Sequence, residues 1–312
     1  MESIVIKEFP MVSVILNTRN RCNLLHRSIQ SALNQTYKDF ELIVVDGASE
    51  DQTKAVVEVY IGKDSRVRYL YVEENKSGAY CINLGFKAAK GEFIAILDDD
   101  DEFMPTKIEK QMEVMLQGGA SLGVVYCWEE FWDDKADRFI KIGMETARGD
   151  LYQQLLRGPC TAGGTNMLIR KSAIEKAGGY DDSIAFGSDF QFNLNISKYF
   201  KHDFVPEVLV KTHWNHEYVH LTTQPGGNVN YVSVIEYYQK ILSDHIDGFD
   251  RLPESRLWYY KSIISAASNL QNYGLVFKYL ILGIKTGGIN FKKIKFIYDT
   301  VKRLVVSIFS KK

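Results

Sequence analysis

The sequence has little cysteine and no long apolar run. Four of its 312 residues are cysteine, and none of them is spaced as C-x-x-C. A disulfide framework or a zinc site is therefore not expected, and a reducing compartment fits this composition. No stretch reaches the roughly 18 apolar residues of a membrane span. The first residues also lack the basic region and long apolar core of a signal peptide, so we expect a cytoplasmic protein.

Charge of one sign is not in excess either. The 38 Lys and Arg residues nearly balance the 39 Asp and Glu residues, and 46% of the chain is hydrophobic. This is a globular composition that gives no reason to expect a nucleic acid as partner. The local balance differs, because Leu275–Lys312 has nine Lys and Arg residues and one acid, Asp299. That segment carries +8 and the rest of the chain carries −9.

Short apolar runs alternate with helix-period segments over the first part of the chain. The predicted strands are Val12–Leu16, Phe40–Val45, Val67–Val72, Phe93–Leu97 and Leu122–Trp128, and the predicted helices are Leu24–Leu33, Asn83–Lys90 and Thr106–Leu116. This alternation predicts an α/β fold with a Rossmann-like, mostly parallel sheet flanked by helices. Ligands of such sheets bind beyond the carboxyl ends of the strands.

The pattern changes after Cys127. Residues 128–164 are polar and aromatic, and we expect loops there. The later predicted elements are a strand at Asn166–Arg170, a helix at Asp189–Phe200, a strand at Asp203–Val210 and helices thereafter. We place the domain boundary near residues 220–230, which gives an α/β domain over residues 1–225 and a helical C-terminal region over 226–312.

Two predicted strands run directly into polar residues. The first is followed by Asn17, Thr18 and Arg19, which either face a nucleotide or belong to a helix N-cap with a solvated arginine. The second is followed by Asp46, which either accepts hydrogen bonds from a uracil N3–H or a ribose hydroxyl, or belongs only to the turn. Gly47 lets the backbone bend there. Several such residues in register favour the ligand-binding interpretation.

Four consecutive acids are the strongest local signal. Asp98, Asp99, Asp100 and Asp101 follow the apolar strand FIAIL without a gap. Adjacent carboxylates raise each other's pKa, and a divalent cation, which prefers hard oxygen ligands, relieves the repulsion. The other interpretation is a solvated acidic turn before the next helix. The buried strand directs the run into the ligand crevice, which favours the metal.

Two further motifs each have two interpretations. Lys76 or Tyr80, around the start of a predicted helix, either faces the phosphates of a ligand or lies on the solvated surface. Asp189 follows a glycine-rich approach at the start of a helix. It either takes a proton from an acceptor hydroxyl or serves as an ordinary N-cap.

In this order the motifs resemble the family 2 glycosyltransferases, which have the GT-A fold. The resemblance covers Met11–Thr223 and rests on four segments. VSVILNTRN resembles the family's opening strand, ELIVVDGASEDQT resembles its VVDDGSxDxT segment, and LDDDD resembles its LDxDD metal signature. The fourth segment is GGTNMLIRKSAIEKAGGYDD followed by GSD, which resembles the family's acceptor-side stretch. Gly47 and Ala48 stand where Asp and Gly are usual. Arg19 stands where many members have a stacking Tyr, and a guanidinium also stacks on a base.

The resemblance implies a role for each matching acid. Asp46 is similar to the residue that recognises the base, and Asp189 is similar to the general base. Asp98 and Asp100 resemble the two ends of the DxD motif, with Asp100 as the direct ligand of Mn²⁺ or Mg²⁺ and Asp99 near the ribose or the sugar.

A histidine in the later strand and loop often completes the metal or diphosphate site of the family. His216 fits best by its spacing to Thr222, and His213 and His220 are rivals. The expected donor-binding residues are Asn17, Thr18, Arg19, Asp46, Lys76, Asp98 and Asp99, and the expected metal ligands are Asp98, Asp100 and His216.

The resemblance implies an inverting glycosyltransferase, hexosyl or related. We expect it to move a sugar from a nucleotide-diphosphate sugar, in the first place a UDP-sugar, to a hydroxyl of a glycan or lipid-linked acceptor in surface polysaccharide synthesis. The alternative is a catalytically inactive GT-A-fold scaffold that binds nucleotide sugars, but the intact acids favour the enzyme. A nucleotidyltransferase would want a glycine-rich phosphate loop after the first strand, and NTRNRCN has no glycine.

The end of the chain predicts a basic amphipathic helix. From Ile294 to Ile308, apolar residues recur at helical spacing with Lys and Arg between them. Such a helix either lies on an anionic membrane, here the cytoplasmic face of the inner membrane, or packs on its own domain or on a partner subunit of a homo-oligomer.

Overall fold

The computed structural model describes residues 11–184, 187–218, 230–286 and 295–297, which form two compact units. The first unit consists of residues 11–151, 160–183 and 195–218, and the second consists of residues 152–159, 184, 187–194, 230–286 and 295–297. The predicted boundary at residue 225 lies outside the described residues and stays a prediction. The second unit also includes two segments that precede residue 225, namely residues 152–159 and the described residues of 184–194. A single boundary along the chain therefore does not separate the two units.

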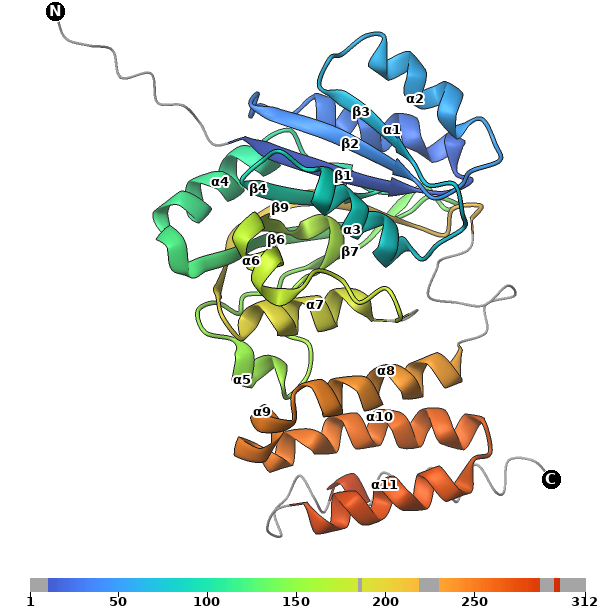
Figure 1. The fold of residues 1–312 in the computed structure, drawn as a ribbon, viewed down its shortest axis with the longest axis vertical. Coiled ribbons are helices and arrows are strands. Elements are labelled where there is room, and N and C mark those ends of the chain that lie inside the picture. The colour runs from blue at the N-terminus through green and yellow to red at the C-terminus, as the bar shows by residue number, and fades with distance from the viewer. Residues whose placement is uncertain (1–10, 185–186, 219–229, 287–294, 298–312) are drawn as a thin grey trace, which may run out of the picture. The chain divides into compact units, whose positions relative to one another are not determined.

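The first unit is built on one sheet of nine strands (Figure 1). The strands are β1 (Val12–Thr18), β2 (Phe40–Asp46), β3 (Val67–Tyr71), β4 (Phe93–Asp98), β5 (Glu102–Phe103), β6 (Leu122–Asp133), β7 (Arg138–Gly143), β8 (Leu168–Arg170) and β9 (Lys201–Trp214). Their order is β3-β2-β1-β4-β8-β6-β9-β5, and β7 pairs with β6. The pairs β1–β2, β1–β4, β2–β3 and β6–β9 are parallel, whereas β5, β7 and β8 are antiparallel to their neighbours. The predicted α/β class with a parallel arrangement of the early strands is confirmed.

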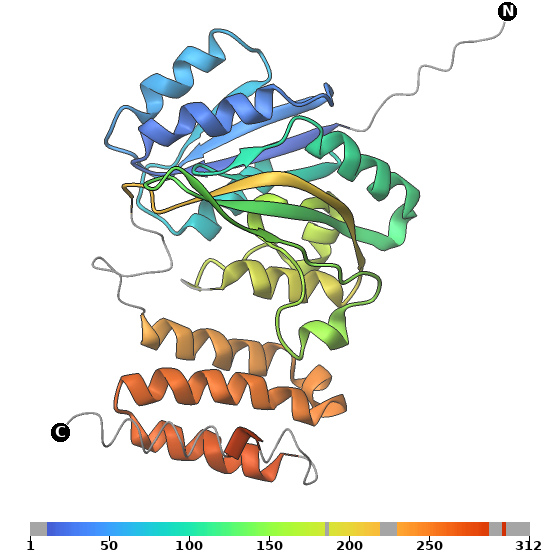
Figure 2. The same ribbon diagram turned by 180° about the vertical axis from the view of Figure 1, so that it is seen from behind.

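Helices cover both faces of this sheet (Figures 1 and 2). They are α1 (Cys22–Leu33), α2 (Thr53–Ile61), α3 (Gly78–Ala88), α4 (Lys107–Gln117) and α6 (Lys171–Ala177), with 3₁₀ turns at Gly119–Ser121 and Gly164–Asn166. Val12, Val14 and Leu16 of β1 face a core shared with α1 and α4. Ile15 points to the opposite face, where a Cβ atom on Gly85 of α3 would lie 2.4 Å from it. Only glycine allows α3 to approach the sheet this closely without a shift.

The expectation of loops over residues 128–164 is wrong in part. β6 continues to Asp133 and forms a hairpin with β7. The pairing of β6 with β9 also extends as far as Asp133. Phe139, Ile140 and Ile142 of β7 are exposed, so this strand has no buried alternating face that its sequence could reveal. Pairing with distant strands therefore decides the structure here.

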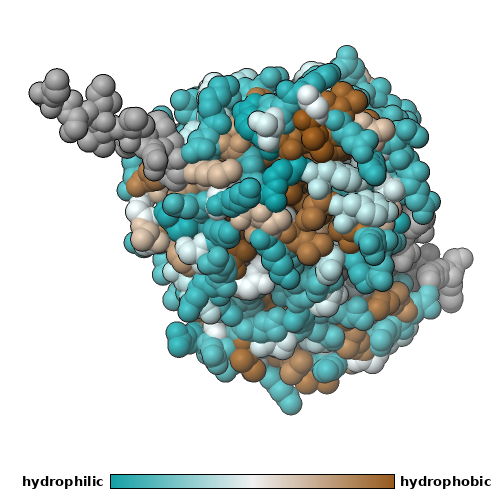
Figure 3. Space-filling model, turned by 45° about the horizontal axis from the view of Figure 1, so that its top comes forward, coloured by the Kyte–Doolittle hydropathy of each residue, from teal (hydrophilic) through white to brown (hydrophobic). Residues whose placement is uncertain are grey.

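The surface seen in Figure 3 is mostly hydrophilic, with apolar side chains in small groups. Large apolar side chains exposed on the first unit include Val59 and Tyr71. Scattered exposure of this kind is ordinary for a globular surface and does not by itself indicate a binding face.

The second unit is helical. It contains α5 (Tyr152–Leu155), residues 188–194 of α7 (Ser188–Ser197), α8 (Tyr231–Asp244), α9 (Ile246–Arg251), the 3₁₀ turn Pro253–Ser255, α10 (Arg256–Asn269) and α11 (Tyr273–Lys285). α10 lies between α8 and α11 (Figure 1) and contacts both. Asn230 and Asn272 cap the N-termini of α8 and α11 with their side chains. The predicted C-terminal helical extension is confirmed.

Most of the predicted basic amphipathic helix from Ile294 to Ile308 lies outside the described residues. Residues 295–297 are described and helical, and Phe296 is buried in the apolar core of the second unit, close to Gly283 of α11. This turn thus packs on its own unit, while the membrane interpretation of the whole segment stays a prediction. Within the described residues, no helix combines the length and apolar character needed to cross a membrane.

Candidate active site

The ends of β1, β2 and β4 lie side by side at one edge of the sheet in the first unit. Thr18 is the register partner of Asp46, and Asn17 is that of Asp98. The three strands are parallel, so their carboxyl ends reach the same edge. The topology therefore brings together the three strand-end motifs of the sequence.

Asp46 is buried and accepts two hydrogen bonds at this edge. The hydroxyl of Tyr69 on β3 donates to its Oδ2 over 2.6 Å, and the backbone N–H of Ser49 donates to its Oδ1 over 2.9 Å. Burial raises the pKa of Tyr69, and the neighbouring Asp46 adds to the rise, so the phenol stays a donor. A carboxylate has about four acceptor positions, so Asp46 keeps capacity for a ligand. Tyr69 is a site residue that the sequence did not reveal.

Asp99 is held by two donors. The hydroxyl of Thr18 donates to its Oδ2 over 2.8 Å, and Nη1 of Arg21 donates to its Oδ1 over 2.8 Å. Burial raises the pKa of Asp99 in spite of the opposing charge of Arg21. Burial lowers the pKa of Arg21, but the charges of Asp99 and Asp100 outweigh it and raise that pKa. Arg21 is thus a half-buried cation in an acidic site. It lies two residues after Arg19 but was not among the residues expected from the sequence.

Asp100 contacts both Arg21 and His216. Its Oδ2 lies 3.1 Å from Nη1 of Arg21 and 3.0 Å from Nε2 of His216. Burial raises the pKa of Asp100, but the contacts with His216 and Arg21 outweigh it and lower the pKa below its usual value. The backbone N–H of Tyr218 donates to Nδ1 of His216 over 3.2 Å. In its neutral form, His216 therefore carries its proton on Nε2 and donates to Asp100.

Asp100 and His216 fit part of a divalent-metal site. A carboxylate oxygen and an imidazole nitrogen suit Mn²⁺, and Mg²⁺ is usually held by one or two carboxylates together with substrate phosphates. Among the residues that the structure describes, no group of three or more His, Cys, Asp or Glu side chains is arranged to hold a metal ion. A bound diphosphate and water would therefore have to supply the remaining ligands.

The other two acids of the run contact the neighbouring segments. The hydroxyl of Thr165 donates to Oδ2 of Asp98 over 3.2 Å and accepts from the backbone N–H of Asp98 over 3.1 Å. Burial raises the pKa of Asp101 well above its usual value, and the charges of Asp98 and Asp100 add to the rise. Asp101 also accepts from the backbone N–H of His213 over 3.3 Å. Asp101 therefore links the acid run to β9, and Thr165 orients Asp98.

The remaining predicted donor-binding residues are less buried. Arg19 donates from Nη1 to the side-chain oxygen of Asn75, and Lys76 forms a surface ion pair with Glu74 at 2.5 Å. Asn17 is half-buried near the end of β1. Arg19 and Asn17 therefore lie at or near the strand edge, and Lys76 lies on the exposed surface of the loop before α3.

The three candidate histidines have different surroundings. His216 contacts the acid run, as described above. His213 is buried, with Nε2 lying 2.8 Å from Oε1 of Glu102 and Nδ1 bonded to Asp134. His220 lies outside the described residues. Asp189 lies in the first turn of α7, among the residues of the second unit.

Comparison with known proteins gives two kinds of similarity. A family profile described as Glycosyl transferase family 2 matches residues 13–178 of this chain. A protein of Rickettsia prowazekii (strain Madrid E), named an uncharacterized glycosyltransferase, is 32% identical over 216 residues, which are 65% of this chain and 64% of that protein. The chain therefore spans less than two thirds of that relative's length.

Two solved structures are similar in fold. Staphylococcus aureus TarS 1-349 in complex with UDP-GlcNAc has a TM-score of 0.60 at 15% identity, over 96% of this chain and 81% of that one. A mannosyltransferase from Pyrobaculum calidifontis in complex with GDP-Man and Mn²⁺ has a TM-score of 0.56 at 15% identity, over 98% of this chain and 89% of that one. These similarities concern the GT-A fold. Because the family profile matches more than half of the chain, the chain belongs to glycosyl transferase family 2.

Proposed function

We propose that the protein is an inverting glycosyltransferase that uses a nucleotide-diphosphate sugar, in the first place a UDP-sugar. The observation that carries the proposal is the contact of Asp100 with both His216 and Arg21, next to Asp99, at the carboxyl ends of β1 and β4. The acceptor is a hydroxyl of a glycan or lipid-linked sugar in surface polysaccharide synthesis.

The donor lies along the edge formed by the ends of β1, β2 and β4. Asp46 accepts from the N3–H of uracil, because its carboxylate keeps acceptor capacity beside Tyr69 and Ser49. Asn17, Thr18 and Arg19 line the β1 end, Asp98 and Asp99 hold the ribose and the sugar, and Lys76 approaches the phosphates. The TarS structure contains UDP-GlcNAc and the mannosyltransferase structure contains GDP-Man, which supports a nucleotide sugar as the class of donor.

Asp100 and His216 would hold Mn²⁺ or Mg²⁺, with Asp98 beside them. Such an ion would supply positive charge opposite the charge that grows on the departing diphosphate. To hold the ion, His216 would have to release Asp100 and present an unprotonated Nε2. A neutral ring would then carry its proton on Nδ1, which would end the hydrogen bond from the backbone N–H of Tyr218. Arg21 is already beside Asp99 and Asp100, and it keeps the site from accumulating uncompensated negative charge.

Asp189 removes the proton from the acceptor hydroxyl. The hydroxyl oxygen then bonds to the anomeric carbon while the bond from that carbon to the diphosphate breaks, which inverts the configuration. A single displacement needs no carboxylate nucleophile. General-base catalysis of this kind contributes roughly 10²- to 10⁴-fold to the rate.

Calorimetric titration with UDP tests the donor site. We expect affinity to depend on Mn²⁺ or Mg²⁺ and to fall in EDTA. Asp100→Ala should lose the metal dependence, whereas Asp39→Ala, an exposed acid of the same unit, should keep it. Equal affinity in EDTA together with full activity of Asp100→Ala would reject the proposal. A panel of nucleotide sugars then identifies the donor.

A further inference from the structure

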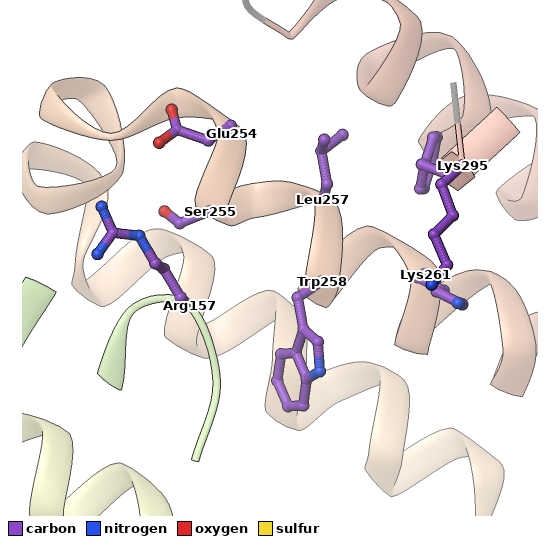
Figure 4. Close-up of a pocket in the computed structure, with 8 residues that line it drawn as sticks. Arg157, Glu254, Ser255, Leu257, Trp258, Lys261 and Lys295 are labelled. Atoms are coloured by element: carbon purple, nitrogen blue, oxygen red, sulfur yellow. The ribbon is translucent and has the colours of Figure 1, made fainter. Parts of the chain in front are cut away.

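The second unit contains a pocket with three cationic side chains. Arg157 comes from the segment after α5, Lys261 from α10 and Lys295 from the turn at residues 295–297. In the view of Figure 4, Arg157 lies on one side of the pocket and the two lysines lie on the other, with Trp258 between them. Three separate segments thus bring positive charge to one pocket.

The walls of this pocket are apolar and aromatic. Leu257 and Phe296 are buried, and Trp258 is half-buried. Gly158 has a φ of +134° and lies against the indole, since a Cβ atom there would be 3.5 Å from Trp258. This close approach brings the backbone next to Arg157 against the ring. An apolar pocket with a few convergent polar groups is typical of a small-ligand site.

The charge of the pocket selects the ligand. Glu254 is the one acid among the described residues that line it, against three cations, so the pocket attracts an anion. Arginine and lysine are the usual partners of phosphate oxygens. The cavity measures about 210 Å³, below the roughly 300–1,000 Å³ of drug-sized sites, so the ligand is on the scale of one sugar residue.

We infer that this pocket binds a phosphate-bearing saccharide, with the phosphate beside Lys261 and Lys295, the sugar ring against Trp258 and Arg157 on the opposite side of the ring. The ring of Trp258 also contacts Phe190, at 6.2 Å between centroids, and Phe190 directly follows Asp189 in α7. The pocket and the proposed base thus belong to the same unit. The saccharide is therefore part of the acceptor, an assignment that rests on the proposed function, whereas the binding itself does not.

Fluorine NMR of the full chain labelled with 5-fluorotryptophan tests the pocket locally. Trp258 lies in the second unit and Trp128, Trp132 and Trp214 lie in the first, so three resonances report on the unit of the donor site. The Trp258→Phe variant assigns the resonance. The ligands are glucose 1-phosphate, glucose, inorganic phosphate, and vesicles of phosphatidylglycerol or phosphatidylcholine.

We expect glucose 1-phosphate to shift the Trp258 resonance saturably, inorganic phosphate to shift it with lower affinity, and glucose to leave it unchanged. The double variant Lys261→Gln/Lys295→Gln should raise the Kd for glucose 1-phosphate about tenfold or more, because charge-assisted contacts are lost. Lys285→Gln, an exposed lysine on α11 outside the pocket, should leave the Kd unchanged.

Four results would overturn the inference. They are no shift of Trp258, equal Kd values in the double variant and in Lys285→Gln, equal affinity for inorganic phosphate and glucose 1-phosphate, and a shift with phosphatidylglycerol vesicles but not with glucose 1-phosphate. The last would assign the pocket to a lipid headgroup. Donor binding is measured separately by the UDP titration, so failure of the proposed function is distinguishable from failure of the pocket.

Discussion

The first unit carries its candidate donor site at the ends of parallel strands, whereas the second unit carries Asp189 and the cation-lined pocket on helices and the segments next to them. The candidate donor edge is made of buried and half-buried acids with cationic and hydroxyl partners. The second unit is held instead by aromatic rings, with Trp258 edge-on to Tyr238 and Tyr259. Burying charge is costly unless it is paired, whereas aromatic packing stabilises without charge. Donor binding and proton transfer should therefore be separable by mutation.

A pair of buried histidines sharpens the contrast. His202 on β9 has a fully buried ring, and neither of its nitrogens has a hydrogen-bond partner among the described residues. His245 in the second unit is equally buried, but its Nδ1 lies 3.2 Å from the hydroxyl of Tyr152. Both ring nitrogens of His202 thus lack a partner among the described residues, whereas Nδ1 of His245 has one.

The largest expected effect is on turnover, and it distinguishes the proposed role of the second unit from that of the first. Asp189→Asn should lower turnover by about 10²- to 10⁴-fold, because Asn is nearly isosteric but cannot accept the proton. Donor affinity should stay the same, since the proposed donor groups belong to the first unit. Steady-state kinetics and UDP titration measure the two effects. Asp247→Asn, which changes an acid in the first turn of α9, is the matched control. Turnover above about a tenth of the wild-type value would show that Asp189 is not the base.

The next prediction concerns acid stability. Burial lowers the pKa of His202 to about 4. As the pH falls below about 6.5, the imidazole of His202 takes up a proton in the unfolded chain but stays neutral in the folded chain. The free energy of unfolding therefore decreases as the pH falls through this window. At pH 4 the loss attributable to this residue is about 3 kcal/mol. His202→Leu should remove this part of the slope of the free energy of unfolding with pH, as denaturant titrations at pH 7, 5.5 and 4 would measure.

The comparison with His245 supplies the control at neutral pH. His202→Leu should be neutral or stabilising at pH 7, because it removes unpaired buried nitrogens. His245→Leu should cost about 1–2 kcal/mol, because Tyr152 loses a partner. Equal acid slopes in wild type and His202→Leu, or the same loss in both variants at pH 7, would contradict the contrast between the units.

A smaller effect is expected at Asp46, the residue proposed to recognise the base. Tyr69→Phe removes the 2.6 Å hydrogen bond to Asp46 and should lower the free energy of unfolding by about 1–2 kcal/mol. It should also weaken UDP binding, because Asp46 loses one of the groups that orient it. Tyr71→Phe is the control, since Tyr71 is half exposed and stacks on Tyr69 at 6.4 Å. Similar losses in both variants would mean that removal of a tyrosine hydroxyl, and not loss of the bond to Asp46, causes the effect.

These sites differ in how far the sequence predicts them. β1, β2 and β4 are predicted to within two residues because each is a mostly apolar run buried on both faces. The acids that follow them are therefore predicted at the correct edge of the sheet. β7 escapes prediction because its apolar side chains are exposed and its pairing depends on β6.

Partners of the acids are harder to predict than the acids themselves. Thr165 reaches Asp98 from 67 residues away, and Arg21 reaches Asp99 from 78 residues away. No local period encodes such contacts, since they depend on how distant segments meet. The sequence gives one usable signal for Arg21, because a second arginine directly after a strand end needs an anionic partner if it is buried.

The smallest expected effect lies in the turn after β2, where Gly47 is expected from the sequence to provide the bend. The structure puts the left-handed conformation at Ala48 instead, with φ of +60°, the position at which the similar family motif has Gly. A left-handed conformation costs a residue with a Cβ atom about 1–2 kcal/mol, and glycine avoids this cost. Part of the benefit is offset because glycine also gives the unfolded chain more conformational freedom. Ala48→Gly should therefore raise the free energy of unfolding by up to about 1 kcal/mol and leave UDP affinity unchanged. Ala55→Gly, at an exposed position inside α2, should lower it by about 1 kcal/mol, so the two substitutions have opposite signs in the same denaturant titration. A loss of stability in both variants would mean that the turn is not strained at Ala48.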